Sequence, residues 1–207
     1  MPEPATLAGL LLVLGPVVGL IPVAHPALIP VWSASRERQL EIVATHRRAW
    51  WVLNAGFGLA TVATAAGLAI LALTAPTAPG SAALVPGAVA YLAGGVLWCA
   101  VLAIRSRVTP LLGDLVAAGT PTEPVETLVG AAQGGLFAGF VVATAAALVA
   151  VGAGLIAADV VPAVVGVVQV IAGAGVLLWL LAAGDVVPAV IYLPTLVLGL
   201  ALLAGWS

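Results

Sequence analysis

The chain has 207 residues, of which 63% are hydrophobic and 7% are charged, and its formal net charge is −2. Soluble globular proteins carry about 25% charged residues, and disordered chains have few apolar residues, so this composition excludes both classes and predicts an integral membrane protein. The small net charge gives no basis for nucleic-acid binding, and we expect no nucleic-acid partner.

Six apolar segments are long enough to cross a bilayer as helices, which requires about 20 residues each. Charged residues, prolines and glycines bound these segments, which cover residues 6–23, 49–73, 82–104, 128–157, 160–183 and 186–204. Each stays apolar throughout, whereas membrane β-strands alternate apolar and polar residues over about 10 positions. We therefore predict an all-α integral membrane protein, a single polytopic domain with a bundle of about six transmembrane helices.

A polar stretch separates the first two segments. Residues 33–48, SASRERQLEIVATHRR, hold four of the six basic residues of the chain. Pro30 precedes the stretch, Ser33 or Ser35 is a candidate N-cap, and Leu40 and Val43 follow at near-helical spacing. This pattern predicts a short interfacial helix between the first two spans.

The distribution of basic residues predicts the topology. All of them lie between the first and second segments or between the third and fourth: Arg36, Arg38, Arg47, Arg48, Arg105 and Arg107. By the positive-inside rule, residues 33–48 and 105–127 are cytoplasmic loops of a multi-pass protein in the plasma membrane. Tryptophans occur toward the same ends of the spans, as in an aromatic belt: Trp50, Trp51, Trp98 and Trp179.

Two short patterns recur along the chain. The pattern Ala-Gly-Phe-x-x-Ala-Thr-x-Ala occupies residues 55–63 and 138–146, which marks either a duplicated helix pair or a chance match in small-residue sequence. Asp159 and Asp185 each precede Val-Val-Pro-Ala-Val, and we expect both to cap the N-terminus of the helix that follows. The spacings Gly130-x-x-x-Gly134 and Gly135-x-x-x-Gly139 predict close packing of the fourth span at the centre of the bundle.

The candidate site combines the basic loop with polar residues near it. No ionisable residue falls near the middle of a predicted span, which argues against ion-coupled transport. Asn54 and Gln133 lie one to two turns inside the cytoplasmic boundary, where they could form the floor of a pocket beneath His46, Arg47 and Arg48. These five residues are the candidate ligand-binding set. The alternatives are hydrogen bonds between helices for the two amides and membrane anchoring for the arginines.

The sequence offers no strong catalytic or cofactor motif. Ser33 or Ser35 with His46 and Glu41 could form a nucleophile set, but no Gly-x-Ser-x-Gly turn frames the serine. His25 and His46 lack the spacing of a metal site, and the single cysteine, Cys99, can form no intramolecular disulfide. We therefore name no catalytic residue and expect no cofactor or metal.

Three functions remain open. The favoured function is non-enzymatic binding, or uncoupled passage, of a lipid or a small apolar ligand. The first alternative is a membrane-embedded enzyme for a hydrophobic substrate, with Glu37, Glu41 or His46 as acid or base. The second is a structural subunit of a membrane complex. Membrane lipids are the expected partners, and the sequence neither requires nor excludes a homo-oligomer.

Overall fold

The computed structural model describes residues 3–75 and 82–205, and this part of the chain is helical, with no strand. The all-α fold class is therefore confirmed. In chain order the elements are α1 (Pro4–Leu20), the 3-10 turns η1 (Ile21–Ala24) and η2 (Ile29–Trp32), α2 (Arg36–Thr45), α3 (Arg47–Thr74), α4 (Leu84–Ala117), α5 (Glu123–Ala158), α6 (Ala163–Ala183) and α7 (Ala189–Leu203).

Five helices are long and apolar enough to cross a membrane, namely α1 with its η1 extension, α3, α4, α5 and α6. The predicted sixth span is shorter than expected, because α7 has only 15 residues. At about 1.5 Å per residue it measures about 22 Å, against about 30 Å for a bilayer core. The cause is local. Gly184 ends α6 in a left-handed conformation, with φ at 72°, and α7 begins only after Pro188.

The segment predicted as a loop over 105–127 is mostly helix. Helix α4 continues past Arg105 to Ala117, and α5 begins at Glu123, so only 118–122 connect them. Arg105 and Arg107 interrupt the apolar run without interrupting the helix, because both residues have good helix propensity. The two helices contain 34 and 36 residues, or about 50 Å each, so they extend well beyond a single bilayer core.

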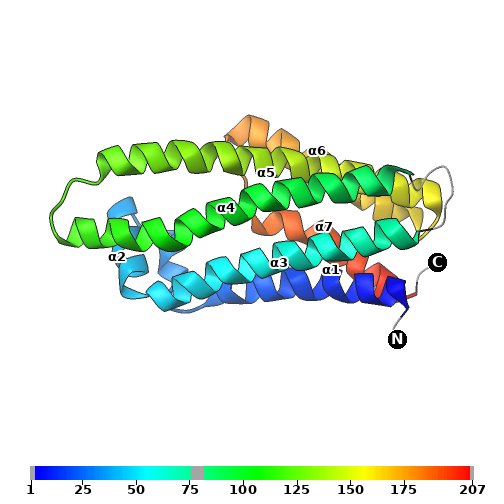
Figure 1. The fold of residues 1–207 in the computed structure, drawn as a ribbon, viewed down its shortest axis with the longest axis horizontal. Helices are drawn as coiled ribbons and strands as arrows, with labels where there is room; N and C mark the ends of the chain where they lie inside the picture. The colour runs from blue at the N-terminus through cyan, green and yellow to red at the C-terminus, as the bar shows by residue number, and fades with distance from the viewer. Residues whose placement is uncertain (1–2, 76–81, 206–207) are drawn as a thin grey trace.

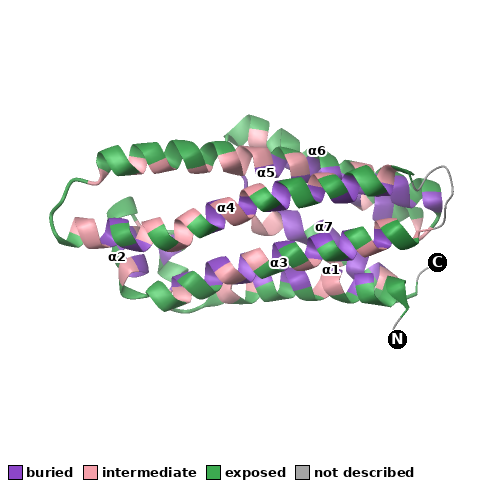
Figure 2. Ribbon diagram, viewed as in Figure 1, coloured by how far each residue is buried: buried purple, intermediate pink, exposed green. Residues whose placement is uncertain are grey.

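The helices form an elongated bundle (Figure 1). Helix α1 begins and α7 ends at the same end of the bundle, and the α4–α5 hairpin projects from the other end. We call this other end the arginine end, because α2, the start of α3 and the second half of α4 bring all the basic residues there. The first half of α5 is largely exposed, whereas its second half is buried against α4 and α6 (Figure 2).

The predicted short helix between the first two apolar helices is present as α2, which follows Ser35 at the N-cap position. It packs against the second half of α4, where a Cβ on Gly113 would overlap the Leu40 carbonyl and lie 2.6 Å from the Ala44 Cβ. Leu40 and Val43, both predicted from their spacing, are buried. Helix α2 therefore covers the part of α4 that extends beyond the bundle.

The two copies of the repeated pattern lie on the two neighbours of α4, one on α3 and one on α5, and both pack against α4. Phe57 in α3 and Phe140 in α5 both contact Trp98, with ring centroids 6.1 and 5.0 Å from it. One turn earlier in α4, a Cβ on Gly95 would lie 2.8 Å from Thr61, and one on Gly94 would lie 3.0 Å from the Thr144 hydroxyl. The repeated residues thus supply similar small and aromatic surfaces to one central helix.

Several local expectations are wrong. Asp159 does not cap α6: it ends α5 with φ at 51°, and Pro162 precedes α6. Asp185 accepts a hydrogen bond from the Val186 N–H at 2.7 Å and lies before the cap of α7, which is Pro188. Trp50 and Trp98 are buried, so they belong to the protein core and not to an aromatic belt, whereas Trp51 and Trp179 are exposed.

The glycine pattern of α5 also differs from expectation. A Cβ added to Gly130, Gly134 or Gly135 would meet no atom within 4 Å. Only Gly139 packs closely, 2.9 Å from Leu97. The central packing of α5 occurs farther along, where Gly152 and Gly154 approach α6 and α4.

Candidate functional site

A cleft opens at the arginine end between α4, the exposed half of α5 and the α6–α7 connection. We call it the arginine cleft, and it has two adjoining lobes. The larger lobe has a volume of about 790 Å³, and the smaller one, of about 200 Å³, lies toward η2, α2 and α3. Both lobes are lined by Trp32, Arg105 and Gln133. The larger volume falls within the range of about 300–1,000 Å³ that is typical of small-molecule sites.

Arg105 is the most unusual residue of the cleft. Its guanidinium carbon lies 5.1 Å from the centroid of the Trp50 ring, and its backbone carbonyl accepts a hydrogen bond of 2.9 Å from the Trp50 indole N–H. Among the described residues, no carboxylate lies within 4 Å of the guanidinium, and the guanidinium donates no hydrogen bond. A cation–π contact contributes about 0.5–2 kcal/mol, and it leaves the N–H donors of the partly buried guanidinium without an acceptor from residues 3–75 and 82–205, so burial of this charge is only partly compensated. An anion in the cleft would offset the remaining cost.

The other arginines have different surroundings. Arg36 pairs with Glu126 of α5 at 2.8 Å, Arg38 pairs with Glu41 at 2.6 Å, and Arg47 pairs with Asp114. Arg48 and Arg107 have no such partner in the described part of the chain, but both are exposed. Arg105 alone combines partial burial with the lack of a carboxylate partner.

Aromatic side chains form the base of the cleft. Trp98 is 1% exposed and stacks on Phe140, and Phe137 lies 5.6 Å from it, between centroids. The Trp98 indole N–H donates to the Tyr192 hydroxyl at 3.1 Å, which fixes the ring. The larger lobe is therefore apolar below and has Arg105 and Gln133 as polar groups on its wall.

Gln133 and Asp185 are the other polar residues that line the larger lobe of the cleft. Gln133 is half-buried, and its amide makes no hydrogen bond to another described residue, so it is free to bind a ligand. Asp185 also lines the larger lobe, but it is exposed and it is not within 4 Å of Arg105. Its carboxylate accepts from its own neighbouring backbone N–H. Arg105 is thus the principal charge in the interior of the cleft.

The residues predicted from sequence are placed in three different environments. His46, at the junction of α2 and α3, and Arg47 and Arg48, in the first turn of α3, are all exposed and line neither lobe. Gln133 lines both lobes of the arginine cleft. Asn54 lies apart, at a smaller cavity. The structure therefore does not bring the five residues together into one pocket.

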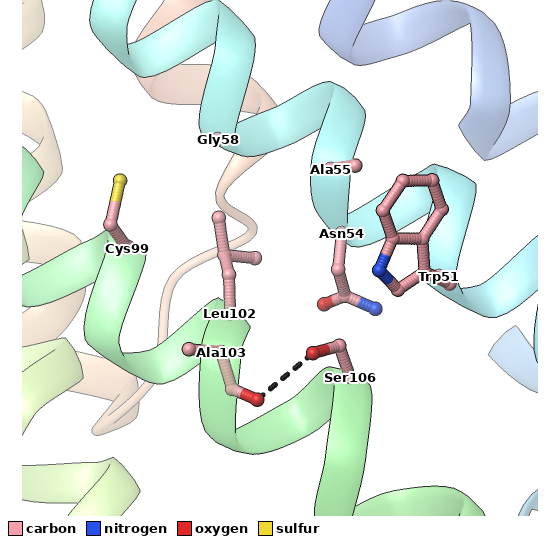
Figure 3. Close-up of a pocket in the computed structure, with 8 residues that line it drawn as sticks. All are labelled: Trp51, Asn54, Ala55, Gly58, Cys99, Leu102, Ala103 and Ser106. Atoms are coloured by element: carbon pink, nitrogen blue, oxygen red, sulfur yellow. Dashed lines mark hydrogen bonds between the residues drawn. The ribbon is translucent and has the colours of Figure 1, made fainter.

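The Asn54 cavity lies between α3 and α4 and has a volume of about 190 Å³. Figure 3 shows Asn54 of α3 and Ser106 of α4 directed toward each other across it, with Trp51 and Cys99 on its walls. The Asn54 amide donates to the Trp50 carbonyl at 2.7 Å, and the Ser106 hydroxyl donates to the Ala103 carbonyl at 2.9 Å. Both polar groups are used within their own helices, and the cavity is small for a ligand.

The acidic candidates for catalysis line a third cavity, of about 460 Å³, between α2 and the end of α4. Glu37 and Glu41 reach it, but both are exposed, Glu41 is paired with Arg38, and His46 is not among its lining residues. Within residues 3–75 and 82–205, no group of three or more His, Cys, Asp or Glu side chains could hold a metal ion.

Sequence reasoning assigned Arg105 only a topological role. Its proximity to Trp50 depends on contact between α3 and α4 across 55 residues, which no local spacing reveals. Comparison of the chain with protein families, curated proteins and solved structures gives no match. Function is therefore inferred from the chemistry of the cleft itself.

Proposed function

We propose that this is a non-enzymatic membrane protein that binds a lipid or small apolar ligand with an anionic end in the arginine cleft. The observation that carries the proposal is the Arg105 guanidinium, half-buried over Trp50 in a cleft of about 790 Å³ and without a carboxylate partner in the described chain. The anionic end would bind Arg105 and the Gln133 amide. The apolar part would lie on Trp98 and Phe137.

Membrane insertion is part of this proposal. Five apolar helices and the shorter α7 support a multi-pass arrangement. In this arrangement α7 crosses the membrane packed against α1. The arginine end would face the cytoplasm by the positive-inside rule. In that orientation the cleft opens near the level of the lipid headgroups.

The proposal can be tested by titrating the detergent-solubilised protein with hexyl phosphate and following its thermal unfolding. A ligand that binds only the folded state raises the midpoint with concentration. We expect Arg105→Gln to weaken binding by about 10- to 100-fold, since hydrogen bonds to charged groups contribute about 1.5–3 kcal/mol. Arg107→Gln, an exposed arginine of the same helix, is the matched control and should bind as the wild type does.

A second pair of variants separates this site from the set predicted by sequence. Arg48→Gln should leave hexyl phosphate binding unchanged, because Arg48 lies outside the cleft. Asp185→Asn should strengthen binding, because it removes a negative charge from the cleft wall. If Arg48→Gln and not Arg105→Gln abolished binding, the ligand would lie over α3 and the proposal would be wrong.

The structural-subunit alternative keeps one specific observation in its favour. Gly130, Gly134 and Gly135 form a small-residue face on the exposed half of α5, where an added Cβ would meet no atom within 4 Å; Gly130 and Gly134 also line the larger lobe of the arginine cleft, whereas Gly135 lies outside it. Such faces permit close approach of another helix. The mass of the detergent-solubilised complex, with and without Gly135→Leu, tests this alternative, because Gly135 lies outside the arginine cleft: a complex that dissociates in the variant would support it.

A further inference from the structure

A further cavity, an apolar groove, lies between α6 and α7. It has a volume of about 410 Å³. Only apolar residues and glycine line it: Val168, Ala172, Gly175, Val176, Trp179, Val190, Leu193, Pro194 and Val197. The two helices touch each other little along this face. Their one side-chain hydrogen bond in the described chain lies toward the far end, where the Gln169 amide donates to the Pro194 carbonyl at 2.7 Å.

The groove leads toward the arginine cleft. Val176 lines the groove, and Leu180, one turn farther along α6, lines the larger lobe of the cleft. On the other wall, Pro188 lines the cleft and Val190 lines the groove. Val176, Leu180 and Val190 all pack on the core cluster that contains Trp98. Residues one helical turn apart are neighbours on a helix surface, so the two cavities adjoin along one wall.

The length of the groove matches one leaflet of a bilayer. From Val168 to Trp179, the first and last residues of α6 that line the groove, the helix rises about 17 Å at about 1.5 Å per residue. Half of a bilayer core is about 15 Å thick. An acyl chain whose headgroup lay at the arginine end would therefore fit along the groove without crossing to the other leaflet.

From the position of Arg105 at one end and the apolar groove beyond it, we infer that the ligand is an anionic phospholipid of the leaflet at the arginine end. Its phosphate binds Arg105 and Gln133, and one acyl chain occupies the α6–α7 groove. This inference rests on the proposed function and deepens it, because the cleft alone would also accept a short water-soluble phosphate. The groove specifies a lipid.

The test uses the full chain with phosphatidylglycerol as the probe and phosphatidylcholine as its zwitterionic counterpart, with retained lipid measured by native mass spectrometry. Gly175→Leu places a side chain in the groove, and its Cβ would meet no atom within 4 Å. Ala174→Leu, on the exposed surface of the same helix outside the groove, is the matched control. We expect Gly175→Leu to reduce retained phosphatidylglycerol about tenfold, and Ala174→Leu to leave it unchanged.

Hexyl phosphate binding, measured on the same variants, distinguishes the two proposals. If the groove holds the chain, Gly175→Leu keeps hexyl phosphate binding and loses phosphatidylglycerol. If Gly175→Leu retains phosphatidylglycerol as the wild type does while Arg105→Gln loses it, the groove inference is overturned and the proposed function stands. If Arg105→Gln loses neither probe, both are overturned. Equal retention of phosphatidylcholine and phosphatidylglycerol would likewise refute recognition of an anionic lipid.

Discussion

The Tyr192 hydroxyl connects three helices beneath the arginine cleft. It lies 2.8 Å from the Thr61 hydroxyl of α3, and it accepts the Trp98 indole N–H of α4 at 3.1 Å. Tyr192 itself belongs to α7 and is fully buried, with its ring stacked on Phe57. Because α7 is short, this buried junction is one of the main contacts that fix its position against α3 and α4.

Tyr192→Phe removes the hydroxyl while it keeps the ring. The Trp98 N–H then has no acceptor, and a buried donor left without a partner costs about 1–3 kcal/mol. We expect a lower thermal unfolding midpoint in detergent. Thr74→Val is the control, because the Thr74 hydroxyl is exposed and donates only to its own helix, at the Ile70 carbonyl. Equal midpoints for Tyr192→Phe and the wild type would contradict the described junction.

Single residues show what the sequence can and cannot predict here. Arg105 and Arg107 have the same sequence signature, and both explain topology equally well. At 3.6 residues per turn, however, residues two apart point to nearly opposite sides of a helix, so only one can face α3 and its Trp50. Which one does so depends on how α4 is rotated in the bundle. The polarity of Gln133 within an apolar run correctly marked it as a residue of a cavity. Its predicted location in the same pocket as Asn54 was wrong, because sequence spacing does not give the distance between residues of different helices.

The contact between α2 and α4 is the element-level feature that shapes the cleft. Arg36, Gln39 and Val43 of α2 line the smaller lobe, so the position of α2 determines its width. That position depends on Gly113, where α4 approaches the Leu40 carbonyl of α2 without any side chain between them. The Arg36–Glu126 pair adds a link from α2 to the first turns of α5, but exposed pairs contribute only about 0–1 kcal/mol.

Gly113→Ala should displace α2, because its Cβ would overlap backbone and not a flexible side chain. Overpacking of this kind costs about 1–3 kcal/mol, so we expect a lower unfolding midpoint and weaker hexyl phosphate binding. Gly135→Ala is the matched control: it lies outside the arginine cleft, its Cβ meets open space, and alanine favours helix by about 1 kcal/mol over glycine. Should Gly113→Ala instead match Gly135→Ala in stability, the α2–α4 contact would not be as close as described.

Hydropathy predicted the positions of the apolar helices well, because long apolar runs leave few alternatives to a membrane helix. It did not predict their ends. Helix α4 continues for a further stretch past Arg105 because α2 covers that part, with Leu112 and Gly113 buried. Helix α7 is shorter than its apolar run because Pro188 delays its start. The end of α4 depends on tertiary packing and the start of α7 depends on a proline. An average of hydropathy over many residues detects neither.

At the scale of the whole molecule, charge and topology agree. The arginines belong to α2, the first turn of α3 and the second half of α4, and these parts lie toward the end of the bundle opposite the start of α1 and the end of α7 (Figure 1). Six crossings would place residues 3 and 204 on one side of the membrane and the arginine cleft on the other. Five crossings, with α7 failing to span, would separate residues 3 and 204. Because α1 begins and α7 ends at the same end of the bundle, and Tyr192 buries α7 against α3 and α4, we expect six crossings.

Labelling of single cysteines, introduced into a Cys99→Ser background, distinguishes six membrane crossings from five. Cysteines at Glu3 and Ala204 report one end of the bundle, and cysteines at Thr45 and Ala118 report the arginine end, all four being exposed positions. With the arginine end in the cytoplasm, a membrane-impermeant maleimide should label Glu3→Cys and Ala204→Cys on intact cells, and the other two only after permeabilisation. Labelling of Glu3→Cys without Ala204→Cys would indicate five crossings. Labelling of Thr45→Cys and Ala118→Cys on intact cells would invert the orientation and place the lipid in the opposite leaflet.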